Sequence, residues 1–252
     1  MSTPTNIRLT GLHTHYQFTE TIRIPIAVIG TTLFPSLSLL FFIVPQPFAQ
    51  NPGDATRGTA QLAVFAVMSV CLFTYGVGVA EDRALPWDGY TRTLPVGPAP
   101  RLMGRLLNGL AFVVLGLVPL VLIARLLTAA TLPPSRLALT VAALIGAGVP
   151  LFALGIGIGY SLSTKAALAV AQSLLLPLAF GGGLFLPPET FPGWLNAIST
   201  WLPTRAGRDL VVTATTGVAL PGTTLLVLGG WTLLTGSLAV WAYKRDEGRR
   251  FR

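Results

Sequence analysis

The sequence predicts an all-α integral membrane protein with six transmembrane helices. Only 10% of the 252 residues are charged and 52% are hydrophobic, which leaves too little polar surface to enclose the apolar side chains in water. Six apolar runs are each long enough to cross a hydrocarbon layer about 30 Å thick at about 1.5 Å per residue. We expect helices, because a backbone amide facing lipid finds no water to bond to and the alternating pattern of barrel strands does not occur in the sequence. The six runs lie at residues 24–44, 59–80, 105–127, 137–161, 166–186 and 223–243.

Polar segments flank this transmembrane region. Residues 1–23 are polar, and the apolar run that follows them has full membrane length and no clear small-residue cleavage site. The first helix is therefore expected to stay in the mature protein. A basic segment, 244–252, follows the last run. The sequence thus predicts an interfacial N-terminal segment, a six-helix domain over 24–243 and a basic C-terminal tail.

The arginines and lysines predict that both termini are cytoplasmic. With that orientation, cytoplasmic segments hold twelve of the 17 basic residues and the opposite side holds five, in agreement with the positive-inside rule. Anionic lipid headgroups beside these segments account for the formal charge of +8. The sequence shows no basic patch interleaved with aromatic residues, so binding of nucleic acid is not expected.

The sequence offers no energy source of its own for transport. All nine Asp and Glu residues lie at or beyond the ends of the apolar runs, whereas a carrier coupled to an ion gradient usually needs a titratable group within a span. A P-loop requires Lys after Gly, but Lys165 follows Thr164 and Lys244 follows Tyr243. We therefore expect a protein that is not an enzyme by itself and that takes energy for transport from a partner.

Candidate metal ligands are few. Cys71 is the only cysteine and lies inside the second run, where a small packing residue is expected. His13 and His15 are two residues apart and would point to opposite sides of a helix, so both are expected to be solvated. No metal site and no cofactor bound by this chain are expected.

Three glycines in the fourth run, Gly155, Gly157 and Gly159, imitate half of a dinucleotide-binding fingerprint. They follow no strand and lie within a membrane-length apolar run, which argues against nucleotide binding. Gly155 and Gly159 instead form a small-residue face that allows close contact with another helix.

Prolines fall inside four of the runs. The missing amide and the ring of proline bend a helix. Irregular packing is the simpler interpretation, and a set of kinked helices that line a cavity is the alternative. The four residues are Pro35, Pro119, Pro150 and Pro177.

A polar segment separates the second and third runs. It reads EDRALPWDGYTRTLPVGPAPRLMGRLLNGL over residues 81–110 and resembles the corresponding loop of ABC-2 type export permeases, especially the daunorubicin-resistance type of bacterial drug exporter. In that family an acidic residue ends the second helix, and a short helix carries an Asp-x-hydrophobic/aromatic-x-Arg/Thr pattern. A Leu-Pro-Val/Met sequence then precedes a Gly-Arg that opens the third helix. The matching positions are Asp82, Asp88, Tyr90, Arg92, Thr93, Leu94, Pro95, Val96, Gly104 and Arg105.

The resemblance implies that residues 84–100 form a cytoplasmic coupling helix that docks in a groove of a separate ATP-binding subunit. Asp88, Tyr90 and Arg92 are the first candidates for this contact. A solvated turn between two helices is the alternative interpretation. The complete implied set is Asp82, Trp87, Asp88, Tyr90, Arg92, Thr93, Leu94 and Pro95.

Two further segments resemble the same family. Residues 12–24 resemble its interfacial connecting helix, with apolar side chains among polar ones. Residues 181–211 resemble its external re-entrant segment, between the fifth and sixth helices. There a triple glycine would break or bend the fifth helix, and two tryptophans suit the water–lipid boundary. An ordinary amphipathic surface helix is the alternative. The residues of interest are Gly181, Gly182, Gly183, Glu189, Trp194 and Trp201.

The resemblance implies a half-transporter of the bacterial plasma membrane. Two copies as a homodimer, or this chain and a paralogue as a heterodimer, would form twelve helices around a path. Two ATP-binding subunits, which hold ATP and Mg, would drive them.

The expected cargo is a lipophilic drug or natural product, as in multidrug efflux and antibiotic resistance. The apolar runs consist mainly of Leu, Val, Phe and Ala, and no buried charge pair is expected. The alternatives are a lipid or polysaccharide export permease, and a membrane assembly or immunity factor that transports nothing.

Overall fold

The computed structural model describes residues 3–23, 25–86 and 99–249, and every regular element within these ranges is helical. The predicted all-α class is confirmed. Two elements, η1 and η3, are short 3-10 helices and η2 is a π-helix. The elements in chain order are α1 (Thr3–Ile22), α2 (Pro25–Phe42), η1 (Pro47–Gln50), α3 (Pro52–Val70), η2 (Cys71–Val77), α4 (Gly78–Ala84), α6 (Ala99–Leu127), α7 (Pro134–Ser161), α8 (Thr164–Gly181), η3 (Pro188–Thr190), α9 (Gly193–Ser199), α10 (Pro203–Thr216) and α11 (Thr224–Arg249).

Five of the described segments are long and apolar enough to cross a membrane, and they match the second to sixth predicted spans. The first predicted span falls on α2, whose described apolar stretch Leu33–Phe42 is shorter, so the sixth span stays a prediction. The four prolines predicted inside spans do lie inside helices. The five segments are Pro52–Ala84, Met103–Leu127, Pro134–Ser161, Thr164–Gly181 and Thr224–Glu247.

The second span is longer than the predicted 59–80. Its helix begins at Pro52, because Asn51 caps it: the Asn51 side-chain oxygen accepts hydrogen bonds from the backbone N–H of Gly53 at 3.0 Å and of Asp54 at 3.4 Å. Proline suits the first helical position, where its missing N–H costs nothing. The π-helix η2 interrupts the regular hydrogen bonding, and α4 continues the same path to Ala84.

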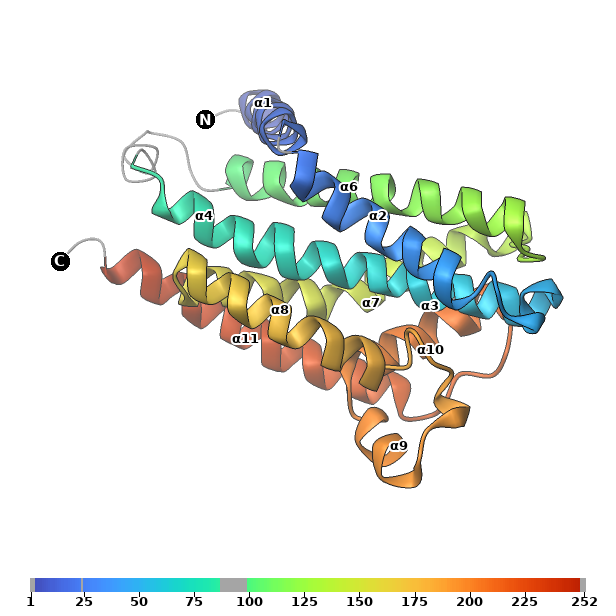
Figure 1. The fold of residues 1–252 in the computed structure, drawn as a ribbon. Coiled ribbons are helices and arrows are strands. Elements are labelled where there is room, and N and C mark those ends of the chain that lie inside the picture. The colour runs from blue at the N-terminus through green and yellow to red at the C-terminus, as the bar shows by residue number, and fades with distance from the viewer. Residues whose placement is uncertain (1–2, 24, 87–98, 250–252) are drawn as a thin grey trace.

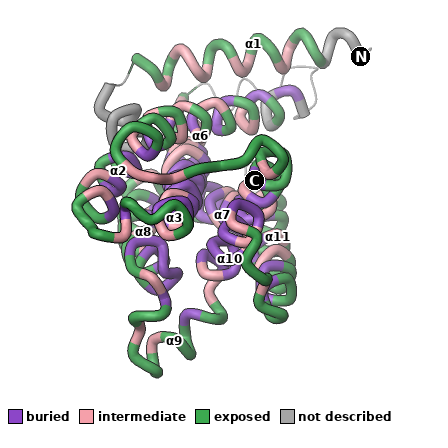
Figure 2. The backbone as a smooth tube through the Cα atoms, turned by 90° about the vertical axis from the view of Figure 1, so that its right-hand side faces the viewer, coloured by how far each residue is buried: buried purple, intermediate pink, exposed green. Residues whose placement is uncertain are grey.

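This second span is the central helix of the bundle. Figure 1 shows α3, η2 and α4 running through the middle, with α2 and α6 on one side and α7, α8 and α11 on the other. In Figure 2 the buried residues gather where α3, α7 and α10 lie against one another. The core therefore forms around the second span.

The glycine face predicted on the fourth span packs against the central helix. A Cβ at Gly155 would clash with the backbone oxygen of Cys71, and one at Gly159 would lie 2.6 Å from the Cβ of Val79. Only glycine permits so close an approach of two backbones. The predicted packing role is confirmed for both glycines.

Helix α1 lies across the bundle rather than along it, as comparison of Figures 1 and 2 shows. It packs on the N-terminal half of α6, where the rings of Phe18 and Phe112 are 5.6 Å apart. A Cβ at Gly104 would lie 2.6 Å from the Cβ of His13. His15 is exposed as predicted, but the prediction of a solvated His13 is wrong, because that residue is half-buried against α6.

The bundle has two distinct ends. At the loop end, α4 ends, α6 begins, α7 turns into α8 and α11 finishes; α1 lies there too (Figure 1). The opposite end, which we call the α9 end, carries α9, and α9 projects from the bundle in both views. Helix α1 and the C-terminal end of α11 thus lie at the same end of the bundle, and the membrane side that this end faces stays a prediction.

Candidate functional site

The predicted coupling residues lie mainly outside the described part of the chain. Trp87, Asp88, Tyr90, Arg92, Thr93, Leu94 and Pro95 fall within residues 87–98, which the structure does not describe. Asp82 is described, on the last turn of α4. The local geometry is therefore built from the helices on either side of the loop.

An ion pair joins the two helices that flank the loop. A guanidinium nitrogen of Arg105, on α6, contacts a carboxylate oxygen of Asp82, on α4. Both positions belong to the family motif identified in the sequence. Arg105 is the more buried partner, and its charge at the head of an apolar helix is offset by the carboxylate. The pair holds the two ends of the loop together.

Arg83, the residue after Asp82, forms its ion pair with α11 and not with α6. Its Nε donates to Oδ1 of Asp246, on α11, at 3.1 Å, and its Nη1 donates to the backbone oxygens of Gly159 at 2.7 Å and Leu162 at 3.2 Å. The side chains of Arg83 and Asp246 are 19% and 4% exposed. Sequence reasoning missed this pair, because both residues lie at apparent span ends, where charges are usually solvated.

A tyrosine in the π-helix ties the central helix to its neighbours deeper in the bundle. The Tyr75 hydroxyl donates to the backbone oxygen of Leu106 at 2.8 Å. Its ring packs edge-on against Phe152 with 4.6 Å between centroids. Because a π-helix turns more slowly than an α-helix, it redirects side chains within a continuous helix, and such turns are frequent at functional sites. Tyr75 thus joins the second span to α6 and α7.

The segment predicted to be re-entrant lies at the α9 end and begins where the sequence predicts a break in the fifth helix. Helix α8 ends at Gly181, five residues before the end of the predicted span, and Gly183 takes a φ of +71° that favours glycine. At Gly182 a Cβ would clash with the hydroxyl of Thr204, on α10. The glycines therefore let the chain turn back closely against α10, and the predicted break is confirmed.

The two tryptophans of this segment are exposed on and beside α9. Trp194 is 68% and Trp201 70% exposed. The backbone oxygen of Trp201 accepts a hydrogen bond from the indole N–H of Trp231 at 2.7 Å, which ties the segment to α11. Glu189 is exposed on η3. Exposed indoles on a projecting helix suit a membrane–water boundary.

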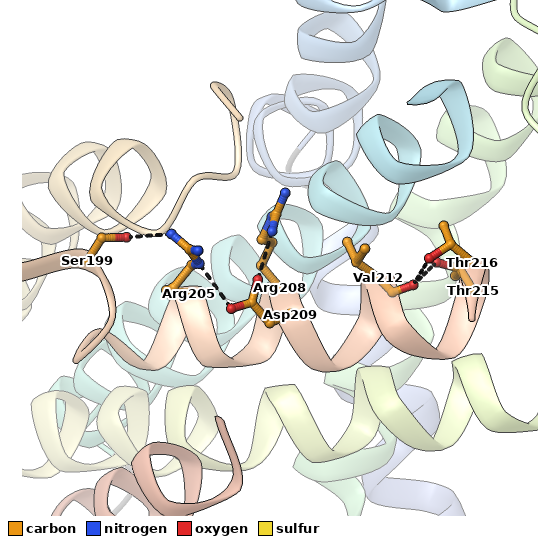
Figure 3. A network of polar contacts seen from close by, with 7 residues as sticks. All are labelled: Ser199, Arg205, Arg208, Asp209, Val212, Thr215 and Thr216. Carbon is orange, nitrogen blue, oxygen red and sulfur yellow. Dashed lines mark hydrogen bonds and ion pairs between the residues drawn. The ribbon is translucent and has the colours of Figure 1, made fainter. Parts of the chain in front are cut away.

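Helix α10 folds back into the bundle and carries charges with it. Nη1 of Arg208 donates to Oδ1 of Asp209 at 2.7 Å, and Nε of Arg205 donates to Oδ2 of the same carboxylate at 3.0 Å (Figure 3). Arg205 also donates to the Ser199 hydroxyl at 3.3 Å. Arg208 and Asp209 are only 5% and 9% exposed. The expectation of no buried charge pair is therefore wrong.

The same arginine reaches the central helix. With its amide oxygen turned toward the guanidinium, Gln61 on α3 accepts from Nε of Arg208 at 3.0 Å and from Nη2 at 2.7 Å. Burial lowers the pKa of Arg208 from its ordinary value, and the hydrogen bond and charge of Asp209 act in the opposite direction. We call Gln61, Ser199, Arg205, Arg208 and Asp209 the α10 network.

A weak pattern in the sequence indicates the buried face of α10. Thr204, Arg208, Val211 and Thr215 recur at helical spacing, and the structure buries all four. A buried face that includes an arginine is easily mistaken for an exposed one, since arginine is rarely buried without a partner. Its partner Gln61 lies far away in the chain and could not be identified from spacing.

Comparison with known proteins identifies the family. The sequence matches the family model described as "ABC-2 type transporter" over residues 9–215. The chain belongs to the ABC-2 type transporter family. The match runs from α1 to the last turn of α10, so it includes residues 84–100, predicted to couple to an ATP-binding subunit, and residues 181–211, predicted to be re-entrant. The resemblance found in the loop sequence is confirmed for the family, and the daunorubicin-resistance subtype stays a prediction.

A curated relative of this ABC-2 chain is a protein of Bacillus subtilis (strain 168) named "Putative transport permease YvfS". The two sequences are 25% identical over 142 residues, which is 56% of this chain and 58% of the relative. The chain therefore spans little more than half the length of the relative that it matches. With the five apolar helices, family membership shows a multi-pass membrane protein of the permease type.

Proposed function

We propose that this chain is the permease subunit of an ATP-driven exporter in the bacterial plasma membrane, and that it moves lipophilic drug-like or natural-product compounds out of the cell. The observation that supports this proposal is the placement of the family's loop. The helices that flank the loop, α4 and α6, meet at the ion pair of Asp82 and Arg105, at the end of the bundle where α1 and the last turn of α11 also lie. We expect a separate ATP-binding subunit to dock at this end.

The paired charges favour a lipophilic cargo. The half-buried guanidinium of Arg83 and the buried guanidinium of Arg208 each contact a carboxylate, so neither offers an uncompensated charge to an ionic cargo. Buried charges that are paired and hydrogen-bonded chiefly hold helices together. A lipid or polysaccharide cargo, and a membrane factor that transports nothing, are the competing functions.

Transport of a fluorescent anthracycline tests the proposal. Proteoliposomes that contain this chain with its ATP-binding partner are expected to move daunorubicin when ATP is supplied and no ion gradient is present. A partner that binds but cannot hydrolyse ATP should abolish the movement. Daunorubicin transport that ignores ATP and appears only with an imposed proton gradient would contradict the proposal.

The ATPase contact itself is tested by charge reversal in the loop. Exchange of Asp88→Lys together with Arg92→Glu should lower co-purification of the ATP-binding subunit by at least about tenfold, because a short helix offers few anchor residues. The matched control reverses an exposed pair with similar spacing at the α9 end, Asp54→Lys with Arg57→Glu, whose charges are 3.7 Å apart. Equal recovery of the partner with both double variants would exclude the loop as the contact.

A further inference from the structure

Two neighbouring residues at the end of α4 direct opposite charges to different parts of the bundle. Consecutive residues of a helix point about 100° apart. Asp82 accordingly contacts Arg105 on α6, whereas Arg83 contacts Asp246 on α11 and the last turn of α7. Both residues lie within five positions of the loop segment 87–98. A displacement of the loop reaches the second span through this turn of helix.

The surroundings of Arg83 hold it tightly. Its guanidinium lies 5.7 Å from the ring centroid of Tyr160, and that ring packs edge-on against Tyr243 of α11 at 5.1 Å. One turn earlier, the backbone oxygen of Ala80 accepts a hydrogen bond from the Thr164 hydroxyl at 3.2 Å, which adds the start of α8. The end of α4 is thus bonded to α7, α8 and α11.

The contact between Arg83 and Asp246 opposes movement of α4 along α7 and α11. A guanidinium that bonds a buried carboxylate and two backbone oxygens has few other ways to satisfy its donors in a bundle of apolar helices. Asp246 is 4% exposed on its side chain, so water offers it little replacement. If α4 moves, α11 and the turn between α7 and α8 must move with it or lose all these bonds.

We infer that the Arg83–Asp246 pair is the joint that carries displacement of the loop to the C-terminal helices α7, α8 and α11. The Asp82–Arg105 pair carries the same displacement to α6. The inference rests on the proposed function, since a partner that hydrolyses ATP supplies the displacement. Arg83 and Asp246 are positioning residues and touch no cargo.

The test separates ATP hydrolysis from transport. Asp246→Asn and Arg83→Gln leave the loop sequence intact, so both variants should still bind the ATP-binding subunit and hydrolyse ATP. The amount of daunorubicin moved per ATP hydrolysed should fall about tenfold, as expected when a coupling between two sites is lost. Asp246→Glu, which keeps the charge, should restore much of this ratio. The control is Lys165→Gln, which removes an exposed positive charge next to the same turn and should leave the ratio unchanged.

A second measurement reports movement without transport, first with the Arg83–Asp246 pair intact. The Lys165→Cys variant, at an exposed position on the first turn of α8, should change its reactivity toward a maleimide when the complex binds ATP, while buried Cys71 stays unlabelled. Asp246→Asn should abolish this response.

These outcomes distinguish failure of the inference about the Arg83–Asp246 pair from failure of the proposed export function. If ATP does not change the maleimide reactivity at position 165 in a complex that transports daunorubicin, the inference about the Arg83–Asp246 pair is wrong. It is also wrong if the ratio of transport to hydrolysis is unchanged in both Asp246→Asn and Arg83→Gln. Failure of the unmodified complex to move daunorubicin with ATP would contradict the proposed function instead.

Discussion

Asp209→Ala is expected to lower the free energy of unfolding by about 3–5 kcal/mol, because it leaves buried guanidinium charge without its carboxylate. Arg208 is 5% exposed, and Arg205 directs its Nε to the same carboxylate. The loss is measured from unfolding in mixed micelles as the fraction of denaturing detergent is raised.

An exposed pair provides the control for this prediction. Asp54→Ala removes the carboxylate that lies 3.7 Å from Arg57, where the two side chains are 44% and 34% exposed. Screening by solvent limits that loss to about 1 kcal/mol or less. A second variant, Arg208→Met with Asp209→Ala, should be more stable than Asp209→Ala alone, because the more buried of the two uncompensated guanidiniums is gone. Equal losses in Asp54→Ala and Asp209→Ala would show that the α10 network does not stabilise the fold.

Gly155→Ala is expected to destabilise the bundle by about 1–3 kcal/mol, since the added methyl group overfills a packed contact. The obstacle is the backbone oxygen of Cys71, which cannot rotate away as a side chain could. The π-helix would have to shift, and with it the contact of Tyr75 with α6. The same detergent titration measures the loss.

Substitution of a glycine that has no close neighbours is expected to raise the free energy of unfolding instead of lowering it. Gly230 on α11 is exposed, and nothing lies within 4 Å of a Cβ built there. Gly230→Ala should therefore stabilise the helix by up to about 1 kcal/mol through helix propensity alone. If both substitutions stabilise, the close approach of α7 to the second span is not a determinant of the fold.

Charge clusters stand at both ends of the bundle; Arg208 and Asp209 are buried at the α9 end, whereas the side chains of Asp82 and Arg83 are 43% and 19% exposed at the loop end. At the α9 end, the α10 network holds a short helix against the central span and reaches Ser199 at the end of α9. At the loop end, Arg83 and Asp82 bind the end of that same span to the helices on both sides of it. The second span contributes to both clusters, so movement at one end can reach the other through a single continuous segment.

The sequence by itself determined the features that depend on local composition. The lengths of the apolar runs predicted the second to sixth spans, because the thickness of a hydrocarbon layer requires that length whatever the neighbours are. The break at Gly181–Gly183 and the close face of Gly155 and Gly159 followed from the missing side chain of glycine. The loop motif identified the family, which the match over residues 9–215 confirms. The contacts of the loop residues 87–98 remain predictions.

The tertiary structure decided which charges are buried and with which partners. Arg83 and Asp246 are 163 positions apart, and Gln61 and Arg208 lie on helices that meet only after the chain folds back. In the sequence Arg83 and Asp246 stand just beyond the ends of apolar runs, and Arg208 lies in the segment between the last two runs, where charges normally reach water. Burial of a charge depends on what surrounds it in space, and its partner is fixed by the packing of helices rather than by spacing along the chain. For this reason the helices could be predicted from the sequence, but the ion pairs that join them could not.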